Sequence, residues 1–408
     1  MAPGAPTDDR GRSGRRSLLT GSTLVALGLA VGQTLGYVLS VAGARLLGPS
    51  GYGELSALLG LLLIGNVVAL AVQTVASRRT SVGVDSPAAL DPLGLRFGAV
   101  EAGAALLVAP VIAAVLHLDV VAVAAVALVL LPVTASGVAL GVVQGARRFA
   151  PLAAQYAVLT GVRTGLALLA LLVRHDVRAA ALGMLVGSVV AWWVVTGLGG
   201  VGRLTAVAPS RAMSRETLHV AHALLAMFTF TSFDVLLARA LQPAEQAGQY
   251  AAGAILVKIA FWLPQAVVVA AFPQMSAREP GALPRAARLV ASLGVLMVLG
   301  AVLLGPAVVP PVLGEGYDVA ANHAWLFVLV GVLESLAYLV VFDRLASRDR
   351  NAVWLVWGAV ALVAVLAAGI GRGPVALAWV LVLASVLLCA AGVVVPRRAD
   401  SDQAPVDV

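Results

Sequence analysis

Long apolar segments follow one another along almost the whole chain of 408 residues. Each is roughly 20 residues long, the length that a helix needs to cross a hydrocarbon core of about 30 Å, and short links bearing arginine, glycine or proline separate them. The sequence lacks the alternation over about ten residues that a membrane β-barrel requires. The pattern therefore predicts an all-α integral membrane protein.

We predict about twelve transmembrane helices. The first apolar segment is longer than the apolar core of a typical signal peptide, so we interpret it as a retained span. The predicted spans are residues 18–42, 52–76, 95–116, 119–143, 152–173, 179–199, 217–240, 247–272, 285–305, 319–342, 352–370 and 374–395.

Basic residues orient these spans. A cytoplasmic N-terminus places twenty arginines on the cytoplasmic side and five on the other side, and leaves Arg163 and Lys258 inside spans, which accounts for all 27 basic residues. Because basic loops remain cytoplasmic, this bias supports an even number of spans with both termini in the cytoplasm. The net charge of +7 then reports arginines that face an anionic leaflet rather than a nucleic-acid partner.

The longest internal link divides the spans into two groups of six. We therefore expect two six-helix bundles, related as a pseudo-two-fold parallel repeat, around a central cavity. The predicted organisation is a disordered cytoplasmic N-terminus at 1–16, a first bundle at 17–199, a cytoplasmic linker at 200–216, a second bundle at 217–396 and a disordered cytoplasmic tail at 397–408.

A repeated hairpin supports this two-fold organisation. The stretch "ARLLGPSGYGEL" from Ala44 lies between the first two spans, where Gly48 permits a left-handed cap and Pro49 blocks continuation of the helix. The same order of Ala-Arg, Leu and Pro returns in "ARALQPAEQAGQ" from Ala238, between spans seven and eight. The offset of 194 residues equals six spans, and an even number of spans preserves orientation.

These hairpins also carry a family resemblance. "GYVLSVAGARLLGPSGYGELSALLGLL" resembles the first two helices of bacterial polysaccharide and lipid-linked oligosaccharide flippases of the multidrug/oligosaccharidyl-lipid/polysaccharide exporter superfamily. "FTFTSFDVLLARALQPAEQAGQYAAGAILVKIAFWLPQAVVVAAFPQMS" is similar to that family's spans seven and eight, including an acidic residue, here Asp234. The chain departs from the pattern at Ser232, where an asparagine is usual, and in having twelve spans where fourteen-span members exist.

The resemblance implies an alternating-access flippase in the bacterial cytoplasmic membrane. Its expected substrate is a polyprenyl-diphosphate-linked oligosaccharide or polysaccharide precursor. Membrane lipids, a proton or sodium as coupling ion, and polysaccharide polymerase or glycosyltransferase machinery are the other expected partners. No nucleic acid and no cofactor is expected.

Ionisable residues inside spans are the candidate site, because each costs on the order of 2.5–3.5 kcal/mol at the bilayer centre on insertion scales. Arg163 and Lys258 are expected to face a shared cavity and neutralise a diphosphate, with the acidic residues pairing with them or carrying a coupling ion. Packing by interhelical ion pairs is the alternative. The predicted substrate-binding residues are Arg163, Lys258, Asp234, Glu334, Arg45 and Arg239.

Composition argues against an enzyme. The chain is 61% hydrophobic and 12% charged, its five histidines are dispersed, and the single Cys389 has no companions for a metal or a disulfide. No phosphate-binding glycine loop or catalytic constellation is present in the sequence, so neither a catalytic nor a metal site is predicted. Two alternatives to a flippase remain open, namely a multidrug or organic-cation antiporter of the same superfamily and a non-transporting membrane scaffold or scramblase.

Overall fold

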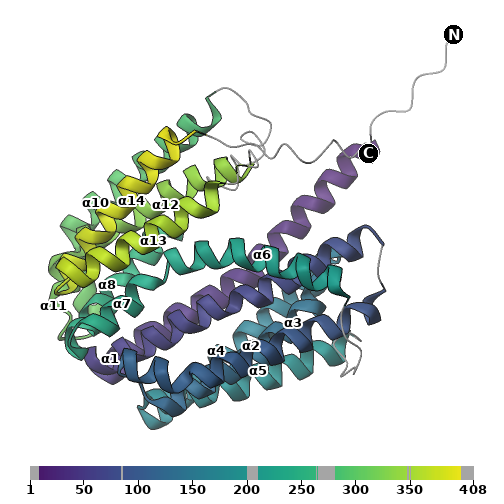
Figure 1. Ribbon diagram of the computed structural model, residues 1–408, viewed down its shortest axis with the longest axis horizontal. Helices are drawn as coiled ribbons and strands as arrows, with labels where there is room; N and C mark the ends of the chain where they lie inside the picture. The colour runs from purple at the N-terminus through teal and green to yellow at the C-terminus, as the bar shows by residue number, and fades with distance from the viewer. Residues whose placement is uncertain are drawn as a thin grey trace.

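The computed structural model is entirely helical over the residues it describes, which are 9–83, 86–199, 210–262, 264, 281–346, 349 and 351–396. Figure 1 shows the arrangement. The helices are α1 (Asp9–Ser81), α2 (Pro87–Leu116), α3 (Val120–Gly145), α4 (Phe149–Arg174), α5 (Val177–Gly199), α6 (Arg211–Phe230), α7 (Phe233–Leu241), α8 (Ala244–Trp262), α10 (Ala282–Leu313), α11 (Asp318–Asn322), α12 (Ala324–Ala346), α13 (Asn351–Ile370) and α14 (Pro374–Val394).

The first helix is a hairpin of two antiparallel arms. Its backbone leaves the helical region at Gly48, where φ is 65° and ψ is −179°. Residues other than glycine rarely adopt this backbone conformation. Gly43 lies directly against Tyr52 and Leu55, which a continuous helix would hold far apart. The predicted turn at Gly48 and Pro49 is therefore confirmed.

The described helices follow the predicted spans in order. Nine of them are long and apolar enough to cross a membrane, or ten when the bent pair α6 and α7 counts as one span. With α1 divided at Gly48 and α8 added, each of the twelve predicted spans has a counterpart among the described residues. The end of the predicted span 247–272 lies outside the described residues, as do the tail 397–408 and most of the linker 200–216.

Two boundaries differ from the prediction. The segment 1–16 was expected to be disordered, whereas α1 already begins at Asp9, because extending an existing helix needs no new nucleus. Span seven is broken between α6 and α7 with a bend of 55°. There the hydroxyl of Thr231 donates to the carbonyl oxygens of Met227 and Phe228, a local bond of the kind that bends helices.

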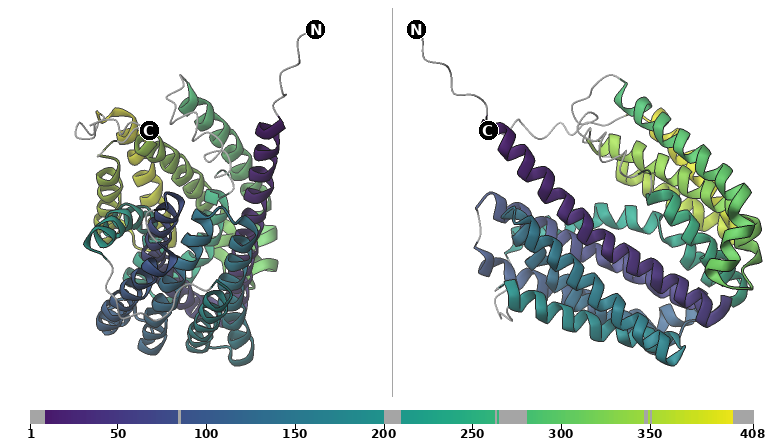
Figure 2. Two further views of the ribbon diagram at one scale, coloured as in Figure 1. Left: turned by 90° about the vertical axis from the view of Figure 1, so that its right-hand side faces the viewer. Right: turned by 180° about the vertical axis from the view of Figure 1, so that it is seen from behind.

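The helices form two halves that meet at one end of the molecule. Helices α1–α5 make up the N-terminal half and α7–α14 the C-terminal half, and the halves diverge towards the end where the chain termini lie (Figures 1 and 2). We call the end where they meet the hairpin face. It comprises residues 45–53, 114–120, 172–178, 239–249, 311–324 and 370–375. The largest core cluster lies here and joins residues of both halves, among them Leu55 and Leu58 with Ile255 and Leu313.

Helix α6 joins the two halves along their length. Near its start Met213 packs into a core cluster of the N-terminal half, and Glu216 forms ion pairs with Arg78 at 2.9 Å and Arg79 at 3.0 Å. Near its end Ala226 and Phe230 pack into a cluster of the C-terminal half. The helix that follows the linker therefore belongs partly to each bundle.

Small residues let the helices of the N-terminal half approach closely. Gly137, Gly141 and Gly145 follow one another at four-residue spacing on α3, and a Cβ at Gly137 or Gly141 would lie 2.7 or 2.5 Å from a backbone oxygen of the second arm of α1. Such stripes of small residues are how membrane helices maximise van der Waals contact, since lipid supplies no hydrophobic force between them. This packing fixes the polar side chains that line the interior of the half.

Candidate functional site

A polar cavity of about 100 Å³ lies inside the N-terminal half. Arg163, from the middle of α4, contributes the one charged side chain to its lining. The rest of the lining combines hydroxyl and amide groups with aliphatic ones: Asn66, Ala69, Leu70, Gln73, Val133, Ser136, Gly137, Leu140, Tyr156, Leu159, Thr160 and Ser188. At roughly 30 Å³ for each molecule in the liquid, the space is that of about three waters.

The guanidinium of Arg163 has no carboxylate within 4.0 Å among the described residues. The acidic residue in the neighbouring spans, Glu101, instead accepts a hydrogen bond from the hydroxyl of Thr134 at 2.7 Å. Around the cavity Gln73 donates to Gln144 at 2.8 Å and to the hydroxyl of Tyr156 at 2.5 Å. The cavity therefore offers a positive charge and hydrogen-bond donors, an environment suited to an anion.

The C-terminal half buries a separate cluster of charges. Asp234 on α7 and Glu334 on α12 are only 4% and 3% exposed, and both carboxylates interact electrostatically with Lys258 on α8. The hydroxyl of Tyr250 donates to Oδ2 of Asp234 at 2.8 Å. Oδ1 of the same carboxylate is buried and has no hydrogen-bond partner among the described residues. One lysine thus faces two carboxylates, and an acceptor atom is left for a proton or a cation.

The structure does not bring the two membrane-embedded cations together. Arg163 lines a cavity whose described lining comes entirely from the N-terminal half, whereas the charges around Lys258 all belong to the C-terminal half. Asp234 and Glu334 do lie together, on α7 and α12. The six predicted site residues therefore fall into an interior cavity in one half, an acidic cluster in the other, and a pair on the hairpin face.

That pair, Arg45 and Arg239, binds backbone carbonyls across the contact between the halves. Arg45 of α1 donates from Nε to the carbonyl of Val312 at 2.8 Å and from Nη2 to that of Pro311, both in α10. Arg239 of α7 donates from Nε to Leu116 at 3.1 Å and from Nη2 to His117 at 2.7 Å, at the end of α2. Both arginines cap helices of the opposite half in this structure.

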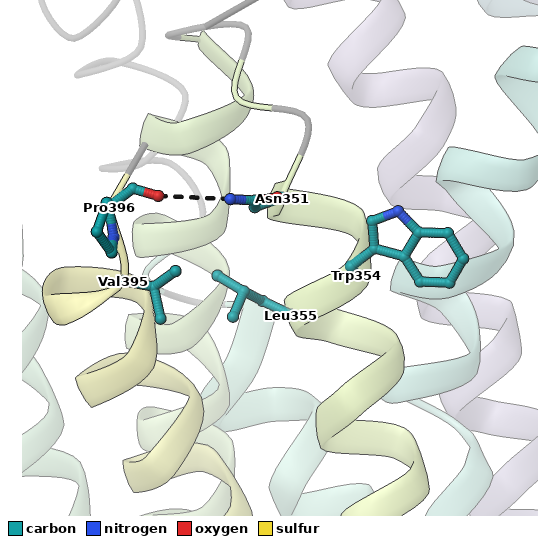
Figure 3. A pocket seen from close by; sticks show the side chains of 5 residues that line it. All are labelled: Asn351, Trp354, Leu355, Val395 and Pro396. Atoms are coloured by element: carbon teal, nitrogen blue, oxygen red, sulfur yellow. Dashed lines mark hydrogen bonds between the residues drawn. The ribbon is translucent and has the colours of Figure 1, made fainter. Parts of the chain in front are cut away.

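A second, shallower pocket of about 470 Å³ lies between the start of α13 and the end of α14 (Figure 3). Its lining is Asn351, Trp354, Leu355, Val395 and Pro396. The amide of Asn351 donates to the carbonyl of Pro396 at 3.4 Å and ties the two helix ends together. The lining of this pocket contains no ionisable side chain among the described residues, and it belongs entirely to the C-terminal half.

Sequence reasoning missed most of the polar lining around Arg163. Asn66 and Gln73 lie on one span and Tyr156 on another, and single amides or hydroxyls in an apolar run carry no local signature. The described residues contain no group of three or more His, Cys, Asp or Glu side chains able to hold a metal ion.

Comparison with known proteins finds the fold but no close relative. No family model and no curated protein sequence matches the chain. Among solved structures, the lipid II flippase MurJ in an inward closed conformation matches with a TM-score of 0.75 and 10% identity, covering 91% of this chain and 86% of that one. A multidrug resistance MATE family transporter of the MOP superfamily, in an inward-facing conformation, matches with a TM-score of 0.66 and 13% identity, covering 90% and 97%.

A third match is a MOP superfamily transporter from Pyrococcus furiosus whose binding pocket is described as having reverse polarity. Its TM-score is 0.62 at 12% identity, covering 91% of this chain and 94% of that one. These structures span nearly the whole chain. The predicted all-α, multi-span architecture is confirmed, and it is the fold of transporters of the MOP superfamily.

Proposed function

We propose that this chain is an alternating-access transporter that moves an amphiphile with a phosphate-bearing, anionic head across the bilayer. A polyprenyl-diphosphate-linked glycan precursor is the substrate class that we favour, in a bacterial cytoplasmic membrane with both termini in the cytoplasm. The observation that carries the proposal is Arg163, a cation in the interior of a half with no carboxylate beside it in the part of the chain that the structure describes. An uncompensated charge at such a depth is costly unless a ligand neutralises it.

The polar lining supports a phosphate ligand over a cation. The hydroxyl of Tyr156 accepts from Gln73 and keeps its own proton to donate. It lines the cavity together with the guanidinium, which pairs with phosphate oxygens in bidentate fashion. An organic-cation antiporter would need carboxylates in this place. In this proposal the phosphate group enters the cavity beside Arg163, while the glycan remains between the halves and the polyprenyl tail in lipid.

The acidic cluster of the C-terminal half is suited to carry a coupling ion. Asp234 retains a buried oxygen with no donor among the described residues, and Lys258 balances only one of the two carboxylates. Binding of a proton or a sodium ion at Asp234 and Glu334 would neutralise the negative charge that Lys258 leaves uncompensated. Under an inside-negative potential, each negative charge moved outwards gains about 2.3 kcal/mol per 100 mV, which also favours export of an anionic head.

Binding of undecaprenyl diphosphate to the purified protein, measured by native mass spectrometry, tests the proposal. We expect Arg163→Gln to weaken binding at least tenfold. The matched control is Arg174→Gln, which removes an exposed arginine at the end of the same helix and should bind as wild type does. Equal binding by both variants would overturn the assignment, and competition by tetraphenylphosphonium would favour the antiporter alternative.

A further inference from the structure

The contacts of Arg45 and Arg239 are equivalent under the internal repeat. The two arginines lie 194 residues apart, and the carbonyls that they bind, 116 and 117 against 311 and 312, lie 195 residues apart. Each arginine uses Nε and Nη2, and each binds the last turn of the helix that enters the hairpin face from the other half. A two-pronged contact of the same kind is therefore made twice, once in each direction, although the order in which the two nitrogens meet the two carbonyls is reversed.

A second pair of contacts is similar in kind at the two hairpins, although its donors are not at matching positions of the repeat. Oε1 of Glu54, at the start of the second arm of α1, accepts from the backbone N–H of Asp119 at 2.7 Å. Oε1 of Gln249, near the start of α8, accepts from the backbone N–H of Val319 at 3.3 Å. Both bonds tie a hairpin to the link that leads into the fourth span of its own half, so they do not cross between the halves.

Helix ends are favourable partners for these guanidinium groups. The last four carbonyls of a helix lack intrahelical donors, and the helix dipole places partial negative charge there. Arg239 is 6% exposed and interacts electrostatically with Glu54 in addition to its two bonds. Because both target helices belong to the opposite half, separating the halves on this face must break all four bonds.

Other contacts close the same face. The hydroxyl of Tyr317, in the link before α11, donates to the carbonyl of Ala44 at 2.8 Å, and its ring lies edge-on to that of Tyr52 at 6.3 Å. Gly53 and Gly248 bring the backbones of α1 and α8 together, so that a Cβ at Gly53 would lie 2.9 Å from the nitrogen of Gly248. None of these contacts carries a charge, which distinguishes the arginines.

We infer that Arg45 and Arg239 form a paired latch that holds the hairpin face closed and sets how often the halves separate there. Their role is to position the halves rather than to bind the transported molecule. The inference goes beyond the proposed function and needs no substrate identity, because it concerns the equilibrium between closed and open hairpin faces. It predicts effects in the same direction for the two arginines, larger for Arg239, which is buried, than for Arg45, which is exposed.

Distances between spin labels test the latch. In a Cys389→Ser background, nitroxides at Arg174→Cys and Arg372→Cys report on exposed positions of the hairpin face in opposite halves. In lipid nanodiscs we expect Arg239→Gln to raise the ratio of open to closed molecules about tenfold, Arg45→Gln to raise it less, and the double variant to raise it more than either.

The control is Arg178→Gln, which breaks an ion pair of 2.6 Å with Asp119 on the same face but within one half, and should leave the distances as in wild type. Arg45→Lys and Arg239→Lys keep the charge but lose the two-pronged bond, so an intermediate shift is expected even if the glutamine variants fold poorly. Unchanged distances in all latch variants would overturn the latch. Because no substrate is present, that result would leave the transport proposal standing.

Discussion

The close approach of the two hairpins makes Gly53→Ala a sharp perturbation of the hairpin face. The added Cβ would lie 2.9 Å from the nitrogen and 3.1 Å from the Cα of Gly248, both backbone atoms that cannot rotate away. Reaching ordinary contact at 3.4 Å requires the two helices to separate by about 0.5 Å. Overpacking of this kind costs about 1–3 kcal/mol. The cost destabilises only the state in which the hairpin face is closed, because the two glycines are in contact only in that state.

That cost corresponds to a shift of roughly 5- to 150-fold from closed to open hairpin faces. The label pair at Arg174→Cys and Arg372→Cys measures it as a growing population at longer distance. Gly103→Ala is the matched control, because Gly103 lies in a helix of the same half with nothing within 4 Å of its Cβ and gains the same helix propensity. Equal distance distributions in the two variants would refute the reasoning that this contact opposes opening.

Three further outcomes are expected from melting temperatures in detergent. Gly48→Ala should lower the free energy of unfolding by about 1–2 kcal/mol, because alanine is strained at the positive φ of the turn; an unchanged melting temperature would contradict the turn's geometry. Tyr250→Phe should cost about 1–3 kcal/mol by removing the donor to the buried Asp234, and the loss should vanish in an Asp234→Leu background, which has no acceptor for the hydroxyl. The hydrogen bond from Arg178 lowers the pKa of Asp119, so this pair stabilises the fold above the ordinary carboxyl pKa of about 4, and the contribution is lost as pH falls through the lowered pKa. The pair is exposed, so its contribution is small, and a difference between wild type and Arg178→Gln that persists in acid would contradict this origin.

The order of the spans followed from hydrophobic length alone, because each apolar run had to cross the bilayer as one helix. The turn at Gly48 followed from local chemistry. The break in span seven was not predicted from the sequence, although "TFTSF" places three hydroxyls where they can form hydrogen bonds to backbone carbonyls of the helix. The four-residue spacing of Gly137, Gly141 and Gly145 was equally visible in the sequence and marks the closest packing of the N-terminal half.

The candidate site was predictable in part. Arg163, Asp234 and Glu334 could be identified because a charge inside an apolar run costs free energy unless it has a partner or a function. In the structure each of them lies beside polar or charged groups. Which charges face one another depends on helix rotation and on how the halves meet, and neither is encoded in a single span. For that reason the separation of Arg163 from Lys258, and the carbonyl partners of the hairpin arginines, emerged only from the fold.

Translocation in proteoliposomes tests the central claim most directly. The measurement follows an undecaprenyl-diphosphate-linked disaccharide, radiolabelled in its sugar, as it becomes accessible to a membrane-impermeant hydrolase on the opposite face. We predict translocation by the wild type, a rate at least tenfold lower for Arg163→Gln, and a wild-type rate for Arg174→Gln. Equal rates for wild type and Arg163→Gln, or equal movement of an undecaprenol-linked disaccharide that lacks the diphosphate, would contradict the account.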